Sequence, residues 1–171
     1  ARGHARGEPA EIVEGGEALR QNNKAIIPTL SNLDIALNKT AHYCYRYARK
    51  NKLSNEETLL YPFICTALET SGDIYKKTIT NVFQEKPRKE HVVLNTAIEK
   101  LLTTTLTLTL NRTTQHAINC ANAYDETQTL IKKMLPTRTT ALYQELAGTL
   151  ITIQSSQLGM LKEIEKVDNG K

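Results

Sequence analysis

Two stretches of the sequence repeat one spacing of apolar residues 34 positions apart. Within each stretch the apolar side chains step by four, so they lie on one face of a helix. The matched positions are Leu60, Ile64 and Leu68 in the first stretch and Leu94, Ile98 and Leu102 in the second. Two helices of about twelve residues with their turns fill such a period. Because these units bury their apolar faces on one another, the period predicts a stacked helical protein and favours binding over catalysis.

Composition points to the same fold class. The chain has 171 residues, enough for one domain with a substantial core, and it contains no Trp, two Phe, eight Gly and five Pro. These proportions favour helices over a sandwich or a barrel. No run of about 18 apolar residues is present, so we expect no membrane insertion. The predicted fold is all-α, with six to seven helices arranged as antiparallel hairpins or, alternatively, as an irregular helical bundle.

The N-terminal segment differs from the rest of the chain. We predict that residues 1–24 form an extension and that residues 25–168 form a single helical-repeat domain. The first seven residues contain Arg2, His4 and Arg6 and no acidic residue. This composition is typical of the stub that remains after an organelle presequence is removed. A cloning remnant is the alternative. Gly15 and Gly16 weaken the short helix that could follow Pro9. The expected location is the matrix side of a mitochondrion.

Several breaks in the helical pattern predict where elements end. Pro62 is expected to kink a helix or to begin a new one, because proline cannot donate a backbone hydrogen bond. Ser71-Gly72-Asp73 is expected to form a turn that separates two helices. Residues 103–110 alternate Thr and Leu, which is the period of a strand. Their helical neighbours on both sides favour a helix or a turn instead.

The sequence contains no recognisable catalytic motif. It lacks a P-loop, a dinucleotide-binding fingerprint and the HExxH and GxSxG patterns, so we expect no enzyme activity and no cofactor. Cys44, Cys65 and Cys120 are an odd number of cysteines without metal-ligand spacing. We therefore predict buried thiols in a reducing compartment and no metal site.

One local cluster combines cations with aromatic side chains. Residues 42–52 read HYCYRYARKNK, a helix end in which Arg46, Tyr47, Arg49 and Lys50 are the candidate partner-binding residues. A solvated helix end with tyrosines partly in the core is one interpretation, since cations are favoured at helix C-termini. Docking to an acidic protein surface is the second. The third is binding of RNA, in which the tyrosines stack on bases and the cations neutralise phosphates.

The repeated stretches also carry a family resemblance. LYPFICTAL at 60–68 and HVVLNTAIEKL at 91–101 resemble degenerate pentatricopeptide repeats, with only this middle pair in register. The resemblance implies hairpin repeats that bind single-stranded RNA, one base per repeat, through a polar residue early in the first helix. Asn95 occupies such a position, whereas its counterpart Tyr61 does not fit. Loss of that pattern favours a surface reused for protein contact.

The size of the chain, its basic N-terminal stub and its degenerate repeats are together similar to the small pentatricopeptide-like accessory subunits on the catalytic head of euglenozoan mitochondrial ATP synthase. This resemblance implies a structural subunit bound to the alpha subunits. An organellar single-stranded RNA-binding repeat protein is the first alternative. A secreted helical-bundle antigen or inhibitor is the second, and it predicts glycans on Asn38 or Asn111 and an intramolecular disulfide.

Overall fold

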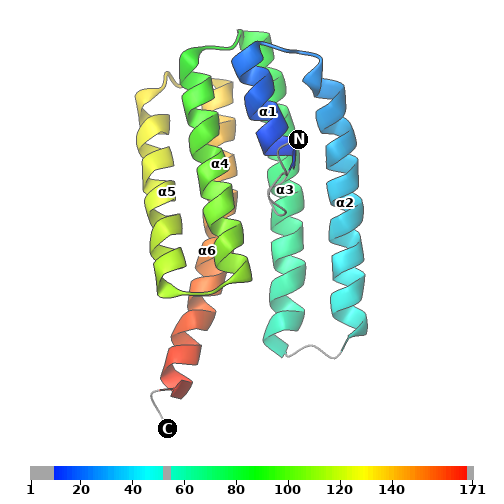
Figure 1. Ribbon diagram of the computed structural model, residues 1–171, viewed down its shortest axis with the longest axis vertical. Coiled ribbons are helices and arrows are strands. Elements are labelled where there is room, and N and C mark those ends of the chain that lie inside the picture. The colour runs from blue at the N-terminus through cyan, green and yellow to red at the C-terminus, as the bar shows by residue number, and fades with distance from the viewer. Residues whose placement is uncertain (1–9, 52–54, 169–171) are drawn as a thin grey trace, which may run out of the picture.

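The computed structural model describes residues 10–51 and 55–168, and these residues form an elongated antiparallel bundle (Figure 1). Six helices are present in the described part of the chain, and it contains no strand, which confirms the predicted all-α class. The helices are α1 (Ala10–Gln21), α2 (Ile26–Lys50), α3 (Asn55–Glu85), α4 (Lys89–Leu110), α5 (Thr114–Lys133) and α6 (Arg138–Asp168). The basic stub at residues 1–7 lies outside the described part.

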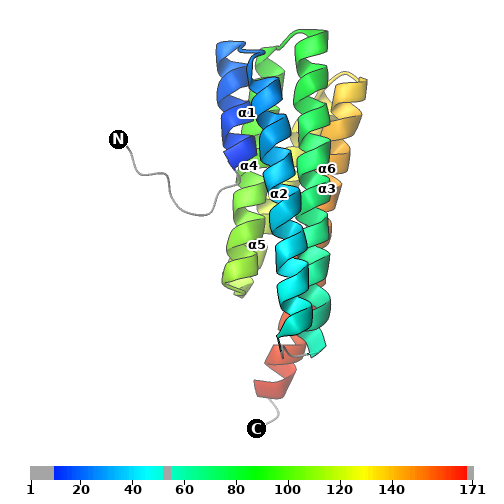
Figure 2. The same cartoon turned by 90° about the vertical axis from the view of Figure 1, so that its right-hand side faces the viewer.

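The helices differ in how many neighbours cover them. The long helices α3 and α6 pack on one another at the centre, α2 packs along α3, and α4 and α5 form a hairpin against α6 (Figures 1 and 2). The largest fully buried side chains come from α2, α3, α4 and α6: Leu30, Tyr75, Ile79, Phe83, Leu94, Ile98, Leu101, Leu108, Tyr143, Leu146, Leu150 and Ile153. Five of the six matched repeat positions are buried, so the predicted apolar faces are confirmed.

The turn predicted at Ser71-Gly72-Asp73 is wrong, because α3 is one helix of 31 residues that also contains Pro62. Ser71 and Gly72 are buried, and the hydroxyl of Ser71 donates to the carbonyl of Ala67 at 2.8 Å. A turn would expose backbone groups that the neighbouring helices cover here, so packing outweighs the local preference for a break. The first repeat copy therefore lies on one long helix and not on a helix–turn–helix hairpin.

The alternating Thr and Leu segment is helical throughout, as favoured in the sequence. Its threonines satisfy their hydroxyls within the helix, since Thr103, Thr105, Thr107 and Thr109 each donate to the carbonyl four residues earlier at 2.8–2.9 Å. This back-bonding replaces the contacts that a strand would offer to a β-branched side chain. The alternation of Thr and Leu therefore does not produce a strand, and the segment packs as a helix against α5 and α6.

The segment predicted as an extension contributes α1, which packs on α2, α3 and α4. Ala18 and Leu19 join the core. Gly15 and Gly16 allow the approach: a Cβ atom on Gly15 would overlap the Tyr75 hydroxyl, and one on Gly16 would lie 2.7 Å from Nδ2 of Asn95. The two glycines that weaken the helix in isolation are thus what lets it lie against α3 and α4.

Candidate partner-binding surface

Helix α2 carries the predicted binding residues, and an ion pair holds it on α3. Leu30, Asp34, Ala41 and Ala48 are its buried residues. The carboxylate of Asp34 accepts a hydrogen bond from the ammonium of Lys76 on α3, and that hydrogen bond is the main cause that raises the pKa of Lys76. One face of α2 is therefore committed to the bundle, which leaves the opposite face to solvent.

Three tyrosines lie on the solvent side of the C-terminal half of α2. The exposed fractions are 67% for Tyr43, 42% for Tyr45 and 55% for Tyr47. The interpretation in which these tyrosines are partly in the core is therefore wrong. Ala41 and Ala48 take the positions that face the bundle, so the larger side chains between them point outward. Exposed tyrosines offer large, stiff contact area at a small cost in conformational entropy.

The predicted cations surround these tyrosines. Arg46, Arg49 and Lys50 are all exposed, and the Arg49 guanidinium lies 5.6 Å from the centroid of the Tyr45 ring, within range of a cation–π contact. Nε of Arg46 donates to the carbonyl of His42 at 3.4 Å. Among the described residues, none of the ion pairs includes any of these three cations.

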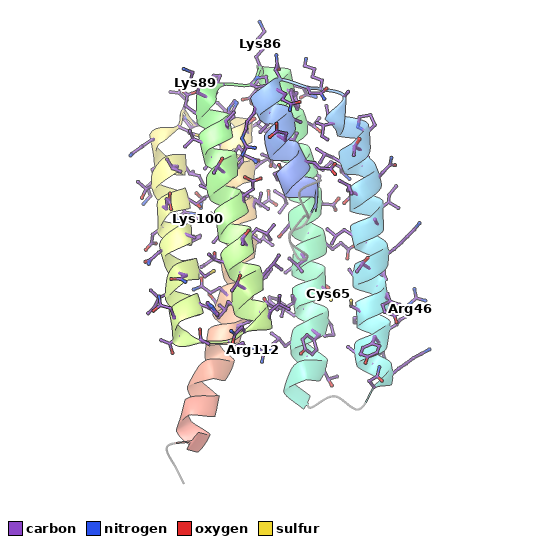
Figure 3. All side chains as sticks on the ribbon, viewed as in Figure 1. Arg46, Cys65, Lys86, Lys89, Lys100 and Arg112 are labelled. Atoms are coloured by element: carbon purple, nitrogen blue, oxygen red, sulfur yellow. The ribbon has the colours of Figure 1, made fainter. Side chains whose placement is uncertain are left out.

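The helix end that presents these side chains is well terminated. The backbone N–H of Asn51 donates to the carbonyl of Tyr47 at 3.1 Å, and Nδ2 of Asn51 donates to the same carbonyl at 2.8 Å. Arg49 and Lys50 occupy the last turn, where the helix dipole favours cations. Figure 3 shows Arg46 on the outer side of this end of α2. We call Tyr43, Tyr45, Arg46, Tyr47, Arg49 and Lys50 the basic tyrosine face.

The basic tyrosine face unites all four residues predicted from the sequence with two that were not among the candidates. Arg46, Tyr47, Arg49 and Lys50 share it with Tyr43 and Tyr45. Helical periodicity alone could have added Tyr43, which precedes Tyr47 by one turn. Tyr45 needed the structure, because its helical position lies close to those of the buried Ala41 and Ala48, and only its exposed fraction of 42% shows that the ring is not covered.

A second surface feature was missed in the sequence. A shallow groove of about 370 Å³ runs between α3 and α6, with Phe63, Thr66, Glu145 and Gly148 among its lining residues. Leu59, one turn before Phe63, is 76% exposed. The sequence places Leu59 and Phe63 beside the inward-facing residues Leu60 and Ile64, and only the position of α6 shows that they remain uncovered.

Asn95, the position that the resemblance associates with base reading, is inaccessible. Its side chain is fully buried, and its Oδ1 accepts a hydrogen bond from the Tyr75 hydroxyl at 3.0 Å. Gly16 of α1 lies over its Nδ2. Asn95 therefore connects α3 and α4 inside the bundle and cannot contact a base.

In residues 10–51 and 55–168, no three His, Cys, Asp or Glu side chains are grouped so that they could hold a metal ion. None of the described helices combines the length and the apolar character that crossing a bilayer requires. No family model, no curated protein and no solved structure matches this chain.

Proposed function

We propose that this chain is a non-catalytic accessory subunit that docks on a larger protein through the basic tyrosine face of α2. The observation that carries the proposal is the concentration, at one helix end, of three exposed tyrosines and three cations that form no ion pair with another described residue. Tyrosine and arginine are the residue types that most often dominate the energy of protein interfaces. Their arrangement here suits a partner with an acidic surface.

The charge of the chain supports this type of partner. The formal net charge is +4, and the cations of α2 lie together. Opposite charge on the partner would speed association and orient the encounter. The aromatic rings would then supply the area that is removed from water. In this proposal the cations of α2 orient the partner, and the tyrosines of the same helix are then buried in the interface.

For the particular partner we propose the alpha subunits on the catalytic head of a mitochondrial ATP synthase, on the matrix side. The support for this choice is the resemblance in the sequence. The test is native purification of the tagged protein from its own cells in mild detergent, followed by mass spectrometry. Recovery of alpha and beta subunits in fixed stoichiometry would support the choice. Recovery of the chain alone would overturn it.

Charge reversal tests the proposed surface separately from the identity of the partner. Arg49→Glu with Lys50→Glu changes the last turn of α2, and Lys132→Glu with Lys133→Glu changes the last turn of α5 by the same charge. Both pairs meet the same helix dipole, so they are matched for stability. We expect the α2 pair to abolish co-purification and the α5 pair to preserve it. Equal loss with both pairs would exclude a specific role for α2.

Binding of single-stranded RNA is the second candidate function, and the exposed tyrosines beside cations favour it. Such a surface can stack bases without reading sequence. Because phosphate contacts release counterions, the affinity would fall steeply with salt and would be lowered by the α2 charge reversal. Burial of Asn95 limits this candidate to binding without base reading at that position. Fluorescence anisotropy with a labelled oligonucleotide at two salt concentrations distinguishes RNA binding from protein docking.

A further inference from the structure

Cys44 and Cys65 come together in the structure, although they belong to different helices. Cys44 lies on α2 and Cys65 on α3, and Cys44 is close enough to Cys65 to contribute to the raised pKa of the Cys65 thiol. Both thiols are partly exposed and free. The sequence predicts buried thiols, which holds for Cys120 alone. The pairing was invisible in the sequence because 20 residues lie between the two cysteines.

The register of the two helices accounts for the contact. Ten residues separate Asp34 from Cys44 along α2, and eleven separate Lys76 from Cys65 along α3. At a rise of 1.5 Å per residue these lengths are about 15 Å and 16.5 Å. Since α2 and α3 are antiparallel and Asp34 contacts Lys76, the two cysteines lie at the same level. The ion pair and the thiol contact are therefore two points of one register.

The surroundings of the pair permit a close approach of the two helices. Ala41 and Ala48 are the buried residues of α2 on either side of Cys44. Their small side chains bring the α2 backbone near α3, and a disulfide needs Cα atoms about 4.4–6.8 Å apart. Figure 3 shows Cys65 on α3 at the level of Arg46 on α2.

We propose that Cys44 and Cys65 form a reversible disulfide that cross-links α2 to α3. The oxidant is a small-molecule disulfide of the glutathione type. One cysteine thiolate attacks a sulfur of the oxidant, forms a mixed disulfide and releases one thiol. The second cysteine then attacks the protein sulfur of the mixed disulfide, forms the cross-link and releases a second thiol. Two protein thiols are oxidised, one disulfide is reduced to two thiols, and the two protons pass to the released thiols.

The cross-link encloses the basic tyrosine face. The closed loop runs from residue 44 to residue 65 and contains Tyr45, Arg46, Tyr47, Arg49 and Lys50. Oxidation would therefore hold this end of α2 against α3, whatever binds there. The inference is independent of the proposed docking function, because it concerns a bond within the chain.

The reaction is expected to be slow. Burial, with a further contribution from Cys44, raises the pKa of Cys65 to about 11. Few Cys65 side chains are ionised at neutral pH, and only the thiolate attacks a disulfide. Cys120 is fully buried beside the hydroxyl of Thr105 at 3.3 Å, so it is shielded from the oxidant and serves as an internal control.

The test uses the full-length protein incubated with oxidised glutathione and then unfolded in an alkylating reagent. We expect the intact mass to reveal one alkylated cysteine, and peptide mapping to identify it as Cys120 and to find a linked pair of peptides with Cys44 and Cys65. The melting temperature should rise by roughly 5–10 °C on oxidation and return with reductant. Cys44→Ser and Cys65→Ser should each abolish the rise, and Cys120→Ser should retain it.

Two results would overturn the proposal. The first is three alkylated cysteines after prolonged oxidation of the folded protein. The second is oxidation that stops at a glutathione adduct or joins two molecules, because either product means that the two sulfurs do not reach one another. Non-reducing electrophoresis separates the linked dimer from the intramolecular bond.

Discussion

Helices α4 and α2 have similar lengths, 22 and 25 residues, yet α4 has nine buried residues and α2 has four. α4 is covered by α1, α5 and α6, whereas α2 has α3 along its length and α1 near one end. This difference in burial indicates that α4 and α2 have different roles in the bundle. α4 supplies burial that stabilises the fold, and α2 keeps a face on which three tyrosines and three cations are exposed. Substitutions should therefore affect stability in α4 and binding in α2.

The largest expected loss of stability comes from truncating an apolar side chain at the centre of α4. Ile98→Ala removes a fully buried side chain and leaves a cavity, so we expect the free energy of unfolding to fall by about 2–5 kcal/mol. Ile35→Ala on α2 is the matched control, because Ile35 is 51% exposed and should change stability by less than about 0.5 kcal/mol. Urea denaturation followed by circular dichroism measures both. Equal losses would remove the distinction between the two helices.

A smaller loss of stability is expected from a substitution that disturbs the close approach of α1 to α3 and α4. Gly15→Ala places a methyl group against the buried Tyr75 ring, so we expect a loss of about 1–3 kcal/mol despite the better helix propensity of alanine. Gly148→Ala on α6 is the control: its Cβ would meet nothing within 4 Å, so we expect a gain of about 0.5–1 kcal/mol. Thermal unfolding should show shifts of opposite sign. Shifts of the same sign would argue that α1 does not pack as described.

The ion pair that holds α2 is expected to contribute less. Lys76→Met leaves the buried carboxylate of Asp34 without its cation, for which we expect a loss of about 1–2 kcal/mol, whereas Lys77→Met at an exposed neighbour should have little effect. The hydrogen bond to Asp34 raises the pKa of Lys76 on folding. Its stabilisation is therefore complete below the ordinary value of about 10.4 and is lost as pH rises through the folded-state value. Denaturation at pH 7 and pH 11 checks both statements.

The smallest effect concerns His91 at the start of α4. Burial, followed by the charge of Arg88, lowers its pKa, and its Nδ1 accepts the backbone N–H of Arg88 at 3.3 Å. Protonation in the folded state would break that hydrogen bond. The stability is thus complete above the ordinary pKa of about 6.5 and is lost as pH falls toward the lower folded-state value. We expect His91→Gln to flatten the stability profile between pH 7 and pH 5. An unchanged profile would contradict the assignment.

Periodicity predicted the interior of α3 and α4 well. Leu60 and Ile64 are buried as expected, and so are Leu94 and Ile98. These predictions hold because an apolar stripe that steps by three and four has one way to leave water. The exposure of Arg46, Arg49 and Lys50 also follows from the sequence, since a charged helix end rarely lies inside a core.

The errors occur where local preference and packing disagree. Ser71-Gly72-Asp73 has the composition of a turn, yet neighbouring helices keep it helical because they bury its backbone. Gly15 and Gly16 would destabilise an isolated helix. In the folded protein their lack of a side chain lets Tyr75 and Asn95 pack closely against α1. Neither outcome follows from residues close in sequence, since each depends on a surface supplied by another helix.

The helical class, the inward faces of the long helices and the basic, tyrosine-rich helix end can all be predicted from the sequence alone. These properties follow from the spacing and chemistry of neighbouring residues. The tertiary structure decided which helices became central, that the tyrosines of α2 lie in solvent and that Cys44 meets Cys65. Those outcomes depend on the register between helices, which Asp34 and Lys76 establish across 42 residues of chain.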